Sequence, residues 1–113
     1  MQTKKVIYQL LKESMDGTEI QKELANDAFL AACKYTKHRM DWAFYTNEEK
    51  ATNDKYRTSC HNHLIDTLNI FFRYMAKENT DAKQVLDELQ TMSRKDIGDI
   101  GNYLAYQLAL SQR

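Results

Sequence analysis

The 113-residue sequence contains no proline, only three glycines and only two cysteines, and its formal net charge is zero. The lack of proline removes the commonest helix breaker, so long helices are permitted throughout the chain. Two cysteines are too few for a disulfide-stabilised scaffold. Basic and acidic residues number 16 each, which disfavours a nucleic-acid-binding protein because such proteins usually carry a basic excess. A local basic patch remains compatible with this balance.

Long hydrophobic runs are also lacking. No stretch approaches the length of a membrane span, and the opening sequence MQTKKVIYQLLKESM has neither the apolar region nor the small-residue cleavage site of a signal peptide. We therefore expect a cytoplasmic protein without membrane association. Hydrophobic residues make up 42% of the chain and aromatic residues 11%, which is sufficient for one folded domain over residues 1–113.

Helical periodicity covers almost the whole chain. Hydrophobic residues recur at intervals of three and four, first up to Met15 and then over residues 18–45, 46–77 and 82–110. This pattern predicts one short N-terminal helix and three long helices. Because long helices joined by tight turns pack against each other in alternating directions, the predicted fold class is an all-α, antiparallel up-down helical bundle.

Local sequence signals support these boundaries. A capping box pairs a Ser, Thr or Asp at the start of a helix with Glu or Gln three residues later. The pattern occurs three times, as Thr18 with Gln21, Thr46 with Glu49, and Asp81 with Gln84. It predicts that a helix begins at each of these places.

The stretch Ser93-Arg94-Lys95-Asp96 has two interpretations. It resembles the start of a new helix, so the last long helix would be broken near Ser93. Alternatively, one helix continues, because the hydrophobic residues on both sides of Ser93 keep the same period. We favour the continuous helix, since its length then matches that of the two preceding helices.

Basic and aromatic residues gather around the predicted hairpin between the second and third helices. Aromatic residues and arginine are the side chains that most often anchor protein interfaces. We therefore predict a partner-binding surface made of Lys34, Tyr35, His38, Arg39, Trp42, Tyr45, Lys55, Arg57 and His61. The alternative is a solvated charged face whose aromatic side chains lie inside the hairpin.

Two glycines lie inside the last helical segment, where each costs roughly 1 kcal/mol relative to alanine. Gly98, Gly101 and Ala105 fall at positions i, i+3 and i+7 and form a strip of small residues. The strip predicts close contact with a neighbouring helix, either within the bundle or across a dimer. The alternative is a kink at one of the glycines.

The histidines suggest chemistry that their spacing does not support. His61-Asn62-His63 repeats the letters of a nuclease signature, but that site needs a hairpin and distant histidines, whereas these three residues lie in a helical pattern. Residues two apart on a helix point to different sides. We expect His63 to lie at the edge of the core and His61 to face water or a partner.

Two further His-x-x-Asp pairs, His38 with Asp41 and His63 with Asp66, have the spacing of metal ligands. In an antiparallel hairpin these pairs would lie ~12 Å apart along the axis, too far to share one ion. We predict local hydrogen bonds or ion pairs instead, and expect no catalytic residue, metal or cofactor. The same register places Cys33 level with Cys60; two buried thiols are favoured over a disulfide.

Two stretches carry a resemblance to known sequences: His61-Asn62-His63-Leu64-Ile65 leading to Arg73-Tyr74, and Arg94-Lys95-Asp96-Ile97-Gly98-Asp99 leading to Asn102-Tyr103. Together they resemble a family of small, uncharacterised helical proteins from Gram-positive bacteria and their mobile elements. The resemblance implies a helical fold and assigns no activity. The sequence thus favours a non-enzymatic bundle that acts through protein–protein contacts, including those of a homodimer. The alternative is a small nucleic-acid-associated regulator that uses the hairpin surface.

Overall fold

A computed structural model describes residues 2–112, which form five α-helices joined by short turns. The helices are α1 (Thr3–Ser14), α2 (Glu19–Trp42), α3 (Asn47–Met75), α4 (Thr80–Leu89) and α5 (Arg94–Ser111). No strand occurs within residues 2–112. The prediction of an all-α chain is therefore confirmed.

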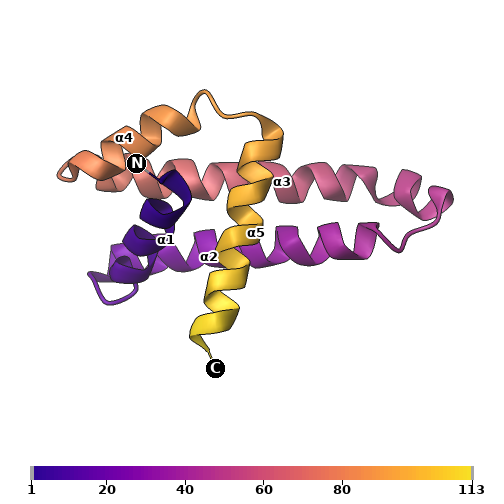
Figure 1. Cartoon of the computed structure of the whole chain (residues 1–113), viewed down its shortest axis with the longest axis horizontal. Helices are drawn as coiled ribbons and strands as arrows, with labels where there is room; N and C mark the ends of the chain where they lie inside the picture. The colour runs from indigo at the N-terminus through magenta and orange to yellow at the C-terminus, as the bar shows by residue number, and fades with distance from the viewer. Residues whose placement is uncertain (1, 113) are drawn as a thin grey trace.

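The two longest helices, α2 and α3, form an antiparallel hairpin that sets the long dimension of the molecule (Figure 1). Helices α1 and α4 pack against one end of this hairpin, and α5 runs across both of its helices. The other end of the hairpin, where α2 connects to α3, projects beyond α5. The molecule measures 47 × 34 × 24 Å along its principal axes.

The predicted continuous helix over residues 82–110 is wrong. Helix α4 ends at Leu89, and Ser93 starts α5 with an extended backbone (φ −71°, ψ 163°) and a side chain that accepts a hydrogen bond from the Asp96 backbone N–H at 3.1 Å. The sequence period continues across Ser93, but the chain changes direction there. As a result α5 crosses the hairpin instead of lying along it, and the three matched helices of the predicted bundle do not form.

Two of the three predicted capping boxes form. The pairs Thr18–Gln21 and Thr46–Glu49 each show both reciprocal hydrogen bonds of the motif. The third prediction is wrong, because the Asn79 side chain starts α4 by accepting a hydrogen bond from the Ala82 N–H at 2.9 Å. Asn79 precedes Asp81 and adopts the extended backbone of an N-cap, so the helix begins before Asp81 is reached.

The core draws its largest side chains from four helices and small side chains from α2. Fully buried are Phe71, Phe72, Ile7, Leu11, Leu64, Leu68, Ile100, Leu104 and Val85. On α2 the buried positions Ala25, Ala28 and Ala32 are completely inaccessible to solvent. Such small residues let neighbouring helices approach the α2 backbone closely.

Helix α5 also approaches closely through its glycines. A Cβ atom at Gly98 would collide with the Tyr35 hydroxyl on α2, and one at Gly101 would lie 2.5 Å from Leu64 Cδ2 on α3. Nearby, the Thr36 hydroxyl donates to the Asn102 side-chain oxygen at 2.9 Å. Ala105, the third residue of the strip, is half-buried. These contacts fix where α5 crosses the hairpin.

Helix α1 joins the beginning of the chain to its later helices. The Tyr8 ring packs edge-on against Phe29 of α2 (ring centroids 6.1 Å apart) and against Tyr103 of α5 (6.4 Å). The Thr3 hydroxyl donates to the Glu88 carboxylate of α4 at 2.8 Å. The core around α1 is therefore complete only when α2, α4 and α5 are all in place.

Candidate functional site

A recess of about 430 Å³ lies where the start of α5 meets the α2–α3 hairpin. Six of the nine residues of the predicted partner surface line it, namely Tyr35, His38, Arg39, Trp42, Arg57 and His61. Ala43, Cys60, Arg94 and Lys95 complete the lining. We call these ten residues the basic recess. Its volume lies within the ~300–1,000 Å³ that is usual for small-molecule pockets.

The other three predicted residues lie outside the basic recess. Lys34 and Lys55 are exposed on α2 and α3, and the half-buried Tyr45 follows α2. The Tyr45 ring packs against the rings of His38 and Trp42, with centroids 6.0 and 6.1 Å apart. Tyr45 therefore supports one wall of the recess from behind.

Aromatic rings form the wall at the hairpin end. The His38 ring stacks edge-on against Tyr56 (centroids 4.6 Å apart) and lies 6.1 Å from Trp42. On Trp42, the Arg57 guanidinium carbon sits 4.7 Å from the ring centroid, within the range of a cation–π interaction. This packing holds an arginine from α3 against a tryptophan from α2.

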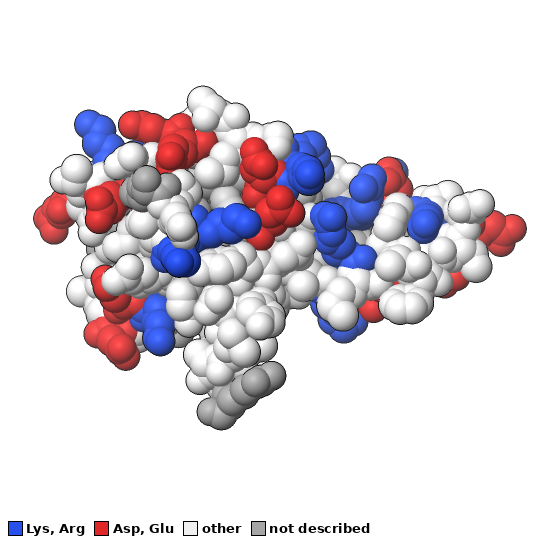
Figure 2. Space-filling view, in the orientation of Figure 1, with Lys and Arg blue, Asp and Glu red and all other residues white. Residues whose placement is uncertain are grey.

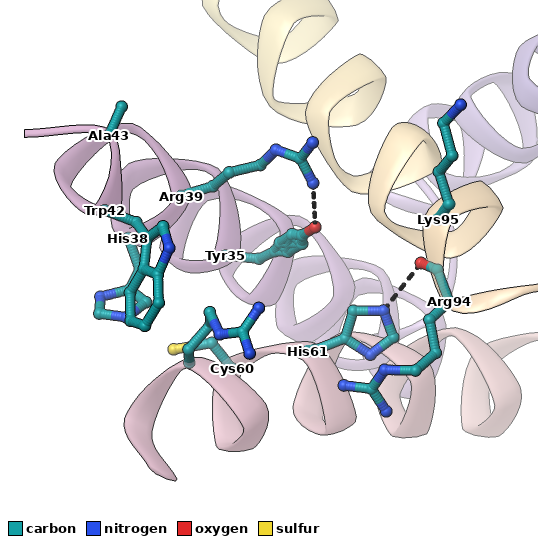
Figure 3. Close-up of a pocket in the computed structure, with 10 residues that line it drawn as sticks. Tyr35, His38, Arg39, Trp42, Ala43, Cys60, His61, Arg94 and Lys95 are labelled. Carbon is teal, nitrogen blue, oxygen red and sulfur yellow. Dashed lines mark hydrogen bonds between the residues drawn. The ribbon is translucent and has the colours of Figure 1, made fainter. Parts of the chain in front are cut away.

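Arg39 and Tyr35 form the part of the lining that faces α5. The Arg39 guanidinium donates a 2.9 Å hydrogen bond to the Tyr35 hydroxyl (Figure 3). Both groups face Gly98, since a Cβ atom there would collide with the Tyr35 hydroxyl and lie 3.6 Å from Arg39 Nη1. The absence of a side chain at Gly98 lets α5 pass directly over this hydrogen-bonded pair.

His61 connects α3 to the first residue of α5. Its Nε2 lies 2.9 Å from the backbone oxygen of Arg94 (Figure 3), and because a carbonyl can only accept, Nε2–H is the donor. The ring is 7% exposed and lies 5.6 Å from the Tyr35 ring. The expectation for the two neighbouring histidines is wrong: His61 is buried and His63 is exposed, because α5 covers the side of α3 that carries His61.

Positive charge dominates the basic recess. Arg39, Arg57, Arg94 and Lys95 line it, and no Asp or Glu does. Figure 2 shows Lys and Arg side chains gathered to the right of α5, over the hairpin. Within residues 2–112 only Arg57 among these four forms an ion pair, with Asp54 at 2.9 Å. Both partners are more than half exposed, so the pair is weak.

The sequence alone did not find Arg94 and Lys95 as members of this site. They lie more than 30 residues from His61 and the rest of the lining, in a segment that we expected to continue a helix. A signal was present, since Ser93 and Asp96 have the spacing of an N-cap. Taking that signal over the hydrophobic period would have predicted a new helix starting with Arg94, but not where it packs.

The two cysteines are free thiols. Burial raises the pKa of the half-buried Cys33 thiol above its usual value. The Tyr56 hydroxyl also has a raised pKa, chiefly because of a hydrogen bond with Cys60. The Cys60 side chain is therefore engaged by a neighbour on its own helix, one turn away.

The His-x-x-Asp pairs do not assemble a metal site. Asp41 forms an ion pair with Lys37 at 3.3 Å, while His38 packs among aromatic rings. Within the described range 2–112, no three His, Cys, Asp or Glu side chains are arranged to hold a metal ion.

Comparison of the chain with protein-family models, with curated proteins and with solved structures finds no match. The resemblance of the two C-terminal stretches to a bacterial family stays a prediction. Among residues 2–112, no helix combines the length and the apolar character needed to cross a membrane.

Proposed function

We propose that this chain acts by binding another protein rather than by catalysing a reaction, and that the partner contacts the projecting end of the α2–α3 hairpin. One observation carries the proposal: large apolar side chains are exposed there. Phe44 is 88% exposed and Met40 is 63% exposed. Exposed apolar surface of this kind, bordered by polar residues, is typical of protein-interaction sites.

The residue types around Phe44 support the same proposal. Trp42 and Tyr45 are half-buried and Arg39 and Arg57 are exposed, so each presents surface to a partner. Tryptophan, tyrosine and arginine supply most of the binding energy in measured interfaces. Because Arg57 already packs on Trp42, both side chains lose little conformational freedom when a partner binds.

A catalytic role has less support. A nucleophile needs a general base within hydrogen-bond reach, and the base needs a partner that orients it. In the part of the chain that the structure describes, neither His38 nor His61 is hydrogen-bonded to Cys60 or to a carboxylate. The one histidine bond in the recess goes to a backbone carbonyl, which holds the ring in a structural role.

Nucleic acid is the alternative partner, and the four cations of the basic recess favour it. A protein that follows a phosphate backbone needs an extended basic groove. Here the cations converge on one recess, and Asp41, Glu48, Glu49 and Asp54 lie on the same hairpin. The observations therefore favour a protein partner, and nucleic acid becomes an outcome of the test.

The test begins with a second copy of the chain as the partner. Light scattering after size-exclusion chromatography is measured for the wild type, for Phe44→Ser and for the control Ile20→Ser, which changes another exposed residue of α2 (54% exposed). A dimer that dissociates only in Phe44→Ser identifies the partner as a second copy. A dimer that persists in Phe44→Ser contradicts the proposed contact surface.

A monomeric wild type leads to a second arm. A photo-crosslinking residue is placed at position 44, or at position 20 as the control, in cells that express the chain. The proposal expects one protein captured at position 44 only, and captured less with the additional change Arg57→Gln. It is contradicted when position 44 captures no more than position 20, or when the chain instead binds nucleic acid in a salt-sensitive manner.

A further inference from the structure

The basic recess concentrates charge that the whole chain does not have. The net charge of the chain is zero, yet four cationic side chains and no carboxylate line one recess of about 430 Å³. Like charges that converge in this way repel one another and lower stability. A ligand that carries negative charge would remove this repulsion.

The four cations come from three helices, so the fold rather than the local sequence brings them together. Arg39 belongs to α2, Arg57 to α3, and Arg94 and Lys95 to the first turn of α5. The first turn of a helix also presents unpaired backbone N–H groups and a partial positive charge. Both features add to the attraction that the side chains exert on an anion.

The guanidinium of Arg39 is already held in position. Its bond to the Tyr35 hydroxyl uses one nitrogen, Nη1, and leaves the other N–H groups of the planar fork for a ligand. Such a fork matches the spacing of two oxygens of a carboxylate or a phosphate. An arginine fixed by a neighbour loses less entropy on binding than one that is free.

The remaining walls suit a flat ring. The side chains of Tyr35, His38 and Trp42 present aromatic surface to the same recess that holds the cations, and Cys60 contributes an apolar sulfur. Aromatic rings pack in offset or edge-on arrangements with one another. An inorganic ion alone would leave this surface unused.

Two lining histidines add polar atoms that lack partners. His38 and His61 are 5% and 7% exposed, and His38 Nε2 and His61 Nδ1 have no hydrogen-bond partner within residues 2–112. A buried polar atom without a partner costs free energy. Such atoms are rare in folded proteins and are concentrated at sites with a function other than packing.

From these observations we propose that the basic recess binds a small organic anion: a planar ring that bears a phosphate or carboxylate group. The acidic group lies among Arg39, Arg94 and Lys95, and the ring lies against Tyr35 and Trp42. This site is separate from the exposed Phe44 surface of the proposed protein contact, so either proposal stands without the other.

Phenyl phosphate is the first probe, with benzoate, inorganic phosphate and phenol for comparison. Each is titrated to about 10 mM, which detects millimolar dissociation constants, and binding is followed by amide chemical shifts and by the fluorescence of Trp42, the single tryptophan. We expect saturable shifts at the basic recess with phenyl phosphate or benzoate, weaker binding of inorganic phosphate, and none of phenol.

A charge-matched pair of variants separates the recess from general attraction. Arg39→Gln with Arg94→Gln removes two charges from the recess, whereas Arg73→Gln with Lys83→Gln removes two exposed charges elsewhere on α3 and α4. The recess variant is expected to bind phenyl phosphate about tenfold or more weakly, because charge-assisted hydrogen bonds are lost. The control should change affinity less than about twofold. If the recess variant does not fold, the single change Lys95→Gln replaces it.

Several results would overturn the proposal. One is the absence of saturable shifts with both ring-bearing acids. Another is an equal loss of affinity in the two charge-matched variants, which would show unspecific attraction. Equal binding of inorganic phosphate and phenyl phosphate would remove the role of the aromatic walls, and tighter binding of a short single-stranded oligonucleotide at the same residues would assign the recess to nucleic acid.

Discussion

His61 and His63 show how a single residue's environment depends on helices far away in the chain. Both lie on α3, and the sequence pattern placed His63 nearer to the core. The start of α5 covers His61, whose Nε2–H donates to the Arg94 carbonyl at 2.9 Å. Periodicity describes one helix at a time, so it could not reveal which side of α3 a later helix would cover.

The candidate site was predictable to the extent that it depends on α2 and α3. Six lining residues lie on that hairpin, where the register of two antiparallel helices follows from their connecting turn. Arg94 and Lys95 could not be assigned, because their place depends on how α5 crosses the hairpin. That crossing is set by fitted surfaces such as Gly98 over Tyr35, which no linear pattern records.

Gly101 provides a test of this close fit at the scale of one residue. A Cβ atom there would lie 2.5 Å from Leu64 Cδ2, and Leu64 is fully buried. Gly101→Val should therefore lower the free energy of unfolding by about 2 kcal/mol or more, as expected for overpacking. Denaturant unfolding measures the change.

Ala109→Val is the matched control, since it adds the same side chain at an exposed position of α5. Its effect should stay within about 1 kcal/mol, the range of helix propensity. Equal losses in the two variants would mean that the α5–α3 contact is not tightly packed at Gly101.

Among the elements, the helix starts with the strongest local signals were the ones predicted correctly. Thr18–Gln21 and Thr46–Glu49 form capping boxes because all their hydrogen bonds lie within four residues. At Ser93 two local signals conflicted, an N-cap and an unbroken hydrophobic period. The N-cap prevailed because the chain gains more by packing α5 across two helices than by extending α4.

Ser93 should contribute to stability in proportion to this role. Its side-chain oxygen accepts from the Asp96 N–H at 3.1 Å, so Ser93→Ala leaves the start of α5 without its cap. The expected loss in the free energy of unfolding is about 1 kcal/mol. Ser93→Asp retains an acceptor and should stay near the wild type by the same measurement. An alanine variant as stable as the wild type would show that the cap does not determine the break between α4 and α5.

Across the whole molecule, burial is uneven. Every residue classed as buried lies at or before His38 or at or after Cys60, so the projecting hairpin end between them contains none. That end is stabilised by helix caps and by contacts between aromatic rings at its base. Regions with few buried contacts open more readily than the core.

Helix α3 allows this difference to be tested within one element. Its residues 47–57 lie in the projecting end, and its residues 64–72 include five buried side chains of the core. Backbone amides of the first group should exchange with deuterium about a hundredfold or more faster than those of the second, after correction for sequence. Mass spectrometry or NMR measures the rates. Uniform protection along α3 would contradict the uneven stability.

The position of α1 has a consequence for synthesis in the cell. The ribosome makes Ile7 and Leu11 early, but the Tyr103 side of their enclosure belongs to α5, which is made last. At about 5–20 residues per second, these greasy side chains remain uncovered on the nascent chain for several seconds. Newly made α1 is therefore the segment that a ribosome-associated chaperone would meet first.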